Sequence, residues 1–135
     1  MLGGGNPVGG SNPAGVGTGI NYVRTENKTF AFAYSGEVLV NQSTPKLLSF
    51  TTGSETIMGK VQFNYYDTAG DNDIQWTLNI NGELVQSAYQ NQAYTPFFNE
   101  IYIVIPPYSI VTFTGFNVSS NTGRKCAASI TGEVF

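Results

Sequence analysis

The chain has 135 residues, the length of one domain with room for a hydrophobic core. Its residues are 41% hydrophobic and only 11% charged, against roughly 25% charged in typical soluble domains. With six basic residues and a net charge of −3, the chain lacks the basic patch that a nucleic-acid partner requires. No apolar run approaches the roughly 18 residues of a membrane span. We therefore expect neither nucleic acid nor membrane as a partner.

Residues 1–28 are predicted to form an extended N-terminal arm that precedes a folded domain of residues 29–135. Residues 1–22 carry no charged side chain and hold eight of the sixteen glycines. A segment so rich in glycine and proline buries too little surface to fold alone. A disordered tail or linker is one interpretation. We favour an assembly arm that lies on a neighbouring subunit, with contacts from its two Asn-Pro pairs: Asn6, Pro7, Asn12 and Pro13.

From residue 29 onward, apolar residues tend to alternate with polar ones, which predicts strands separated by polar turns. In chain order, the predicted strands are residues 29–34, 37–40, 46–51, 57–66, 74–80, 83–88, 100–105, 109–118 and 126–135. The pattern indicates an all-β fold, a single antiparallel β-sandwich of jelly-roll type with about eight strands. An immunoglobulin-like sandwich is the main alternative, although the chain lacks its Cys…Trp…Cys spacing.

Alternation also predicts which residues are buried. In the first strand it places Phe30, Phe32 and Tyr34 on one face, which we expect to face the core. The aromatic residues predicted to lie in the core are Phe30, Phe32, Phe50, Phe63, Trp76 and Phe113.

Two dipeptides predict where strands end. Asn81-Gly82 predicts a tight hairpin between residues 74–80 and 83–88, because both residues tolerate a positive φ. Pro106-Pro107 should end the strand 100–105, because proline has no N–H to donate to a sheet.

The composition argues against catalysis. The chain has no histidine, which removes the commonest general base and transition-metal ligand. Neither a Ser-His-Asp nor a Cys-His arrangement can therefore form. The single cysteine, Cys126, is best interpreted as a small buried strand residue. We expect a non-enzymatic protein without a cofactor.

One acidic loop is a weak candidate for a metal site. Asp67, Asp71 and Asp73 lie close together in the sequence, with a glycine between them. Calcium prefers several oxygen ligands on a loop that can wrap around it. The spacing is not that of an EF-hand, however, and a hydrophilic loop between strands is the favoured interpretation.

A second connection, residues 89–99, is rich in aromatic and amide side chains. Tyrosine supplies a rigid area with a polar tip, and amides supply adaptable hydrogen bonds, so such a loop suits contact with a sugar or a protein. The alternative is that its aromatic residues fold back and cap the sandwich. The predicted contact residues are Tyr89, Tyr94, Phe97 and Phe98.

The C-terminal half resembles the closing strands of small jelly-roll virion proteins, namely capsid decoration (cement), minor capsid and head-fibre proteins. The resemblance rests on residues 103–114 (IVIPPYSIVTFT) and 128–134 (ASITGEV), with support from residues 47–53 and 79–85. It implies a virion structural protein on the capsid exterior. Its partners would be copies of itself, with a trimer favoured, and a major capsid or other virion protein, with the arm clamping neighbouring subunits. The alternative is an adhesive module of fibre type that binds a receptor or carbohydrate.

Overall fold

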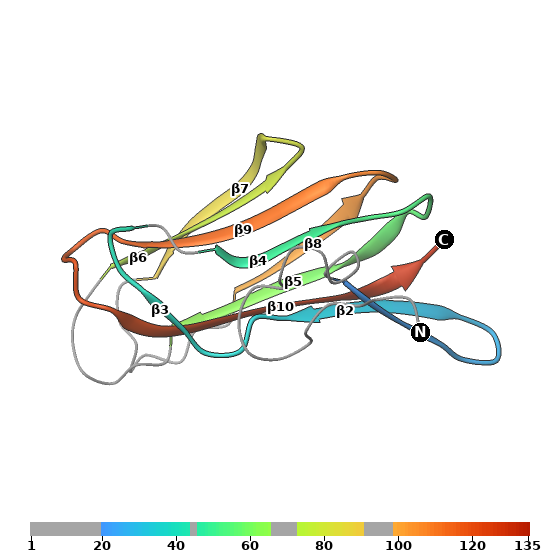
Figure 1. Cartoon of the computed structure of the whole chain (residues 1–135), viewed down its shortest axis with the longest axis horizontal. Helices are drawn as coiled ribbons and strands as arrows, with labels where there is room; N and C mark the ends of the chain where they lie inside the picture. The colour runs from blue at the N-terminus through green and yellow to red at the C-terminus, as the bar shows by residue number, and fades with distance from the viewer. Residues whose placement is uncertain (1–19, 44–45, 66–72, 91–98) are drawn as a thin grey trace.

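The computed structural model describes residues 20–43, 46–65, 73–90 and 99–135. These residues form ten strands and no helix, in antiparallel sheets packed as a sandwich (Figure 1). Within this part of the chain, therefore, no helix is available to cross a membrane. The strands are β1 (Asn21–Arg24), β2 (Thr29–Tyr34), β3 (Val38–Val40), β4 (Lys46–Thr51), β5 (Ile57–Tyr65), β6 (Ile74–Ile80), β7 (Glu83–Gln90), β8 (Asn99–Ile105), β9 (Ile110–Asn117) and β10 (Arg124–Val134).

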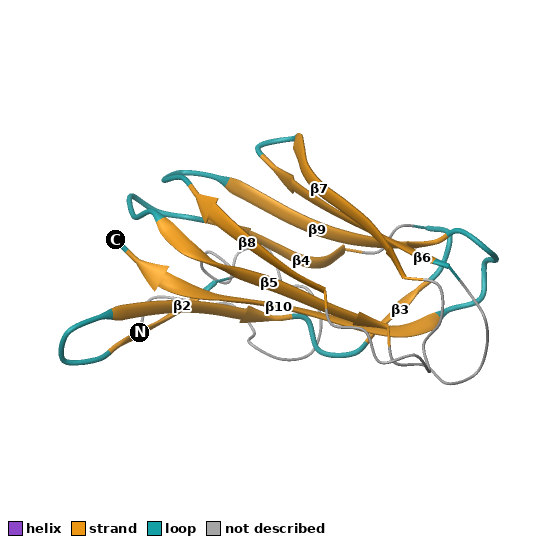
Figure 2. Ribbon diagram, turned by 180° about the vertical axis from the view of Figure 1, so that it is seen from behind, coloured by secondary structure: helices purple, strands orange, loops and turns teal. Residues whose placement is uncertain are grey.

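The larger sheet has six strands, in the order β1-β2-β10-β5-β8 with β3 also paired to β10. The smaller sheet has four, in the order β4-β9-β6-β7 (Figure 2). Four antiparallel pairs are nested in the sequence: β6 with β7, β5 with β8, β4 with β9, and β2 with β10. These eight strands therefore form one long antiparallel ribbon that turns back between β6 and β7. The further pairs β10–β5 and β6–β9 complete the two sheets.

The predicted all-β antiparallel sandwich is confirmed, and β2, β4 and β6 have the predicted bounds. The other predicted strands differ by one or two residues at their ends. The prediction of an arm over residues 1–28 needs correction, because β1 lies within it and pairs with β2. Tyr22 of β1 lies opposite Ala31, so this part of the segment belongs to the larger sheet. Residues 1–19 lie outside the described residues.

An aromatic cluster joins the two sheets at the centre of the core. The ring of Phe63, on β5, lies 4.5 Å from that of Trp76 and 5.5 Å from that of Phe113. The last two rings, on β6 and β9, are 6.0 Å apart. All three residues are buried, as is Phe50, so these four predicted core aromatics are confirmed.

The predicted face of β2 is wrong. The small residues Ala31 and Ala33 are buried, whereas Phe30 and Tyr34 are exposed and Phe32 is half-buried. Both faces of this strand are apolar, so alternation alone does not tell which face turns inward. The aromatic side chains therefore lie on the outer face of the larger sheet.

The long strand β10 is paired along both of its edges. On one edge it pairs with β5, and on the other with β2 and then β3. Where β2 ends, Ser35 continues the pairing: its N–H donates to the carbonyl of Ala128 at 2.9 Å, and its Oγ accepts from the N–H of Ala128 at 2.8 Å. Gly36 follows with a φ of 67°, a conformation that glycine adopts without strain. A side-chain oxygen thus satisfies a buried backbone N–H at this break.

A buried amide connects the smaller sheet to the larger one. The Oε1 of Gln90, at the end of β7, accepts from the N–H of Tyr65 at 3.3 Å, and its Nε2 donates to the carbonyl of Tyr65 at 3.2 Å. Because Tyr65 is the last residue of β5, the amide satisfies both backbone groups there as a neighbouring strand would. The contact joins the ends of β5 and β7 across the sandwich.

The predicted hairpin between β6 and β7 is confirmed. Asn81 and Gly82 have φ values of 54° and 81°, and positive φ at both central residues is what a type I′ turn requires. The turn is held to the start of β9: the N–H of Asn81 donates to the carbonyl of Ile110 at 2.8 Å, and the N–H of Ile110 donates to Oδ1 of Asn81 at 2.8 Å.

Replacing Gln90 by leucine should lower the free energy of unfolding by about 2 kcal/mol, because the buried N–H and C=O of Tyr65 lose this partner. The exposed Gln86 of the same strand provides the control, and Gln86→Leu should change stability by no more than about 0.5 kcal/mol. Urea denaturation of both variants measures the difference. Equal, small effects would show that the amide contact does not stabilise the sandwich.

Candidate functional site

The outer face of the larger sheet is the side turned away from the smaller sheet. On β5, Ile57, Val61 and Phe63 are buried, so the alternate residues Met58 and Lys60 point outward. The strand registers align the outward residues in three rows: Phe30–Glu133–Met58–Val104, Phe32–Thr131–Lys60–Tyr102, and Tyr34–Ser129–Gln62–Glu100.

A mainly apolar hollow of about 520 Å³ lies over the first two rows. Its exposed lining includes Tyr102 (76% exposed), Val104 (54%) and Met58 (51%). Single exposed apolar residues are common on protein surfaces, and here several of them lie together around one hollow. The remaining lining residues are Phe30, Gly59, Lys60, Ile103, Thr131, Gly132 and Glu133.

The hollow results from the side chains of β10, which are smaller or turned aside. Thr131, which points outward, lies between the larger residues Phe32 of β2 and Lys60 of β5. The carboxylate of Glu133 is paired with Nζ of Lys28 at 2.6 Å. The bulkier outward residues of β2 and β5 therefore stand on either side of β10, and the hollow lies between them.

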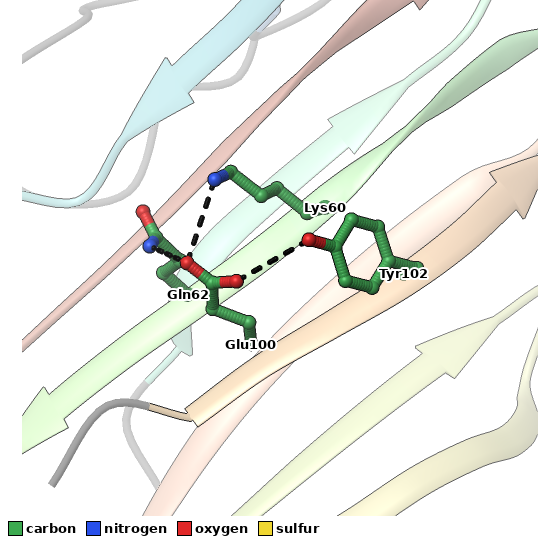
Figure 3. Close-up of polar contacts among 4 residues, drawn as sticks. All are labelled: Lys60, Gln62, Glu100 and Tyr102. Carbon is green, nitrogen blue, oxygen red and sulfur yellow. Dashed lines mark hydrogen bonds and ion pairs between the residues drawn. The ribbon is translucent and has the colours of Figure 1, made fainter.

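Four side chains of β5 and β8 form a polar cluster, namely Lys60, Gln62, Glu100 and Tyr102 (Figure 3). Lys60 and Tyr102 also line the hollow. Oε1 of Glu100 accepts from Nε2 of Gln62 at 2.6 Å and lies 3.4 Å from Nζ of Lys60. Its Oε2 lies 3.5 Å from the hydroxyl of Tyr102. Both partners of the ion pair are about a third exposed, so the pair contributes at most about 1 kcal/mol to stability. These contacts hold the ammonium of Lys60, the amide of Gln62 and the carboxylate of Glu100 together beside the apolar hollow.

The same face continues into a second hollow of about 340 Å³. Gln62 lies between the two, since it belongs to the polar cluster and also lines this second hollow. The other lining residues are Tyr34, Gly36, Phe63, Asn64, Ala127, Ala128 and Ser129. The outer face thus has two mainly apolar hollows with the polar cluster between them.

The groups on this outer face are apolar, amide and ion-paired side chains. Among the described residues, no group of three or more His, Cys, Asp or Glu side chains could hold a metal ion. Burial and the nearby Glu55 carboxylate raise the pKa of Tyr22, which lies on β1 and does not line the hollow. The arrangement can bind a surface through apolar burial and hydrogen bonds.

Of the residues that sequence analysis selected, Tyr89 and Asp73 lie in the part of the chain that the structure describes, and neither lines these hollows. Tyr89 is exposed and belongs to β7 rather than to a loop, which corrects its predicted position, while its role as a contact residue stays a prediction. Asp73 is tied to the segment after β9, because its N–H donates to Oγ of Ser119 at 2.9 Å and its carbonyl accepts from Val118 at 2.8 Å. The remaining candidates lie outside the described residues: Asn6, Pro7, Asn12, Pro13, Asp67, Asp71, Tyr94, Phe97 and Phe98.

Sequence reasoning did not select Tyr102, Val104 or Met58. Residues 101–105 are apolar throughout, so the pattern shows no polar face that would mark the exposed side of β8. The signal that could have found them is the apolar run itself, because such a run on a strand with one exposed face must expose apolar side chains. Comparison with known proteins finds no family model and no curated protein that matches this chain.

Gly59→Ala should destabilise the sheet beneath the hollow. Gly59 lies opposite Gly132, and an added Cβ would lie 2.2 Å from the carbonyl oxygen of Thr131, so the backbone must shift. We expect the free energy of unfolding to fall by roughly 1–3 kcal/mol. Gly53→Ala is the control, because its Cβ would contact only the flexible end of Glu55. Chemical denaturation compares the two, and equal stabilities would contradict the close approach.

Proposed function

We propose that this chain is a virion structural protein that decorates or cements an icosahedral capsid through subunit contacts. Its partners would be copies of itself, with a trimer favoured, and a major capsid or other virion protein on the capsid exterior. The viral setting follows from the resemblance of residues 103–114 and 128–134 to virion proteins. The inference of assembly also has support from the outer face of the larger sheet.

The nested strand order supports a jelly roll in particular. A jelly roll is a double-sheet fold found in viral capsid and lectin domains. Without the short strands β1 and β3, eight strands remain. They pair as one folded ribbon: β2 with β10, β4 with β9, β5 with β8, and β6 with β7. Such a ribbon, wrapped so that β10 meets β5 and β9 meets β6, has the pairing expected of this fold.

The observation that carries the assembly proposal is the hollow on this outer face. Its apolar lining is bordered by the Lys60–Glu100 and Lys28–Glu133 ion pairs. Interfaces between proteins combine an apolar centre with a polar, solvated rim in the same way. Burial of Met58, Tyr102 and Val104 by another protein would remove large exposed apolar side chains from water.

Carbohydrate binding is the second candidate. Tyr102 is highly exposed beside the amide of Gln62 and the charges of Lys60 and Glu100, a combination that suits a sugar ring and its hydroxyls. In that case the chain would be a receptor-binding or fibre-type adhesive module, and the arm would serve as a tether.

Light scattering of the full-length chain over a range of concentrations tests assembly. We expect oligomers, and Met58→Gln should weaken their association about tenfold or more, because burial of a methionine side chain contributes about 1.5–3 kcal/mol. Deletion of residues 2–19 should weaken it further if the arm clamps a neighbour. Leu84→Gln, at an exposed site on β7, is the control that should have no effect.

A glycan array tests the adhesive module. A chain that stays monomeric and binds a glycan saturably, with binding abolished by Tyr102→Ala, would favour the adhesive module instead.

A further inference from the structure

Among the described strands, β8 lies at one edge of the larger sheet. It pairs with β5 over seven residues without a register shift, and among the described residues no strand pairs with its other edge. Free backbone N–H and C=O groups along such an edge can pair with another chain. The other edges are less suitable: β1 and β3 have four and three residues, and the pairings of β4 and β7 contain irregularities.

The sequence of this edge has no protection against pairing. Residues 101–105 carry no charge, and four of the five are β-branched residues with high strand propensity. Natural edge strands usually carry lysine, proline, a bulge or an inward charge that blocks addition of another strand. Here Glu100 precedes the apolar stretch and Pro106 follows it, so both lie at its ends.

We propose that β8 pairs in antiparallel fashion with β8 of a second copy, about a twofold axis at Ile103. This register places Ile101 opposite Ile105, Tyr102 opposite Val104, and Ile103 opposite itself. Directly opposite residues of an antiparallel pair lie on one face, so the exposed Tyr102 and Val104 of each copy meet on the outer face. The proposal deepens the proposed function, on which it rests, by naming one of the contacts between copies.

The same register avoids electrostatic repulsion and extends the candidate surface. Glu100 would lie opposite Pro106 of the other copy, so no like charges face each other within the paired stretch. Within one chain, Val104 lies opposite Met58 and Tyr102 opposite Lys60. The two larger sheets would thus become continuous, and the hollows of both copies would adjoin across the twofold axis. In a lattice of trimers, this twofold pairing would join a subunit of one trimer to a subunit of the next.

Register-specific cross-linking in the full-length chain tests the pairing. Copies carrying Tyr102→Cys are mixed with copies carrying Val104→Cys and oxidised mildly with oxidised glutathione. Opposite residues have Cβ atoms about 4.5–5.5 Å apart, close to the separation that a disulfide needs. We expect disulfide-linked dimers in the mixture and few in either variant alone. The native Cys126 is buried, so the wild-type chain is the control for background cross-linking.

A second measurement uses charge in place of cysteine. Val104→Lys should weaken self-association at least tenfold in light scattering, whereas Leu84→Lys, at an exposed residue of β7, should leave it unchanged. Two results would overturn this pairing and leave the proposed function standing. In the first, oligomers form but the mixture gives no cross-linked dimers. In the second, each variant alone gives as many cross-links as the mixture. A chain that remains monomeric at every concentration would overturn both the pairing and the proposed function.

Discussion

The pairing of β10 is the constraint on which the larger sheet depends. Nine of its eleven residues pair with β5 on one edge, and the other edge pairs with β2 and β3, while β1 and β8 attach through β2 and β5. The alternation of β10 also sets the two faces of the sheet. Cys126, Ala128 and Ile130 are buried against the smaller sheet, so Ser129 and Thr131 must point outward.

That alternation links the fold to the proposed contact surface. Because β10 presents small outward side chains between the bulkier ones of β2 and β5, the outer face is depressed along its centre. The same register aligns Phe30 and Met58 along the hollow and brings Glu100 beside Lys60 and Gln62. This is the surface that we propose for association, and β8, an edge strand among the described residues, lies beside it.

The sequence predicted the elements well and the faces less well. Asn81-Gly82 located the β6–β7 hairpin, since its backbone conformation is a local property of two residues. The face of β2 could not be predicted, because its aromatic residues and its alanines are both apolar and the partner strand decides which set is buried. The strand β1 was missed for a related reason: residues 21–24 form a strand only by pairing with β2, and their own pattern is too short to indicate one.

The candidate surface depends on the same non-local information. Met58, Tyr102 and Phe30 are far apart in the sequence, and only the registers of β2, β5, β8 and β10 bring them together. Conversely, the predicted contacts of residues 89–98 rested on local composition, and of these only Tyr89 is described, within β7.

The most direct test of the account is oxidative footprinting of the full-length chain in its assembled and dissociated states. Met58 and Tyr102 are exposed on the outer face, whereas Tyr108 is exposed in the turn between β8 and β9 and is absent from the lining of the hollow. The account predicts that assembly slows the oxidation of Met58 and Tyr102 relative to that of Tyr108. Equal oxidation of Met58 and Tyr102 in both states would show that the outer face is not the surface buried on assembly.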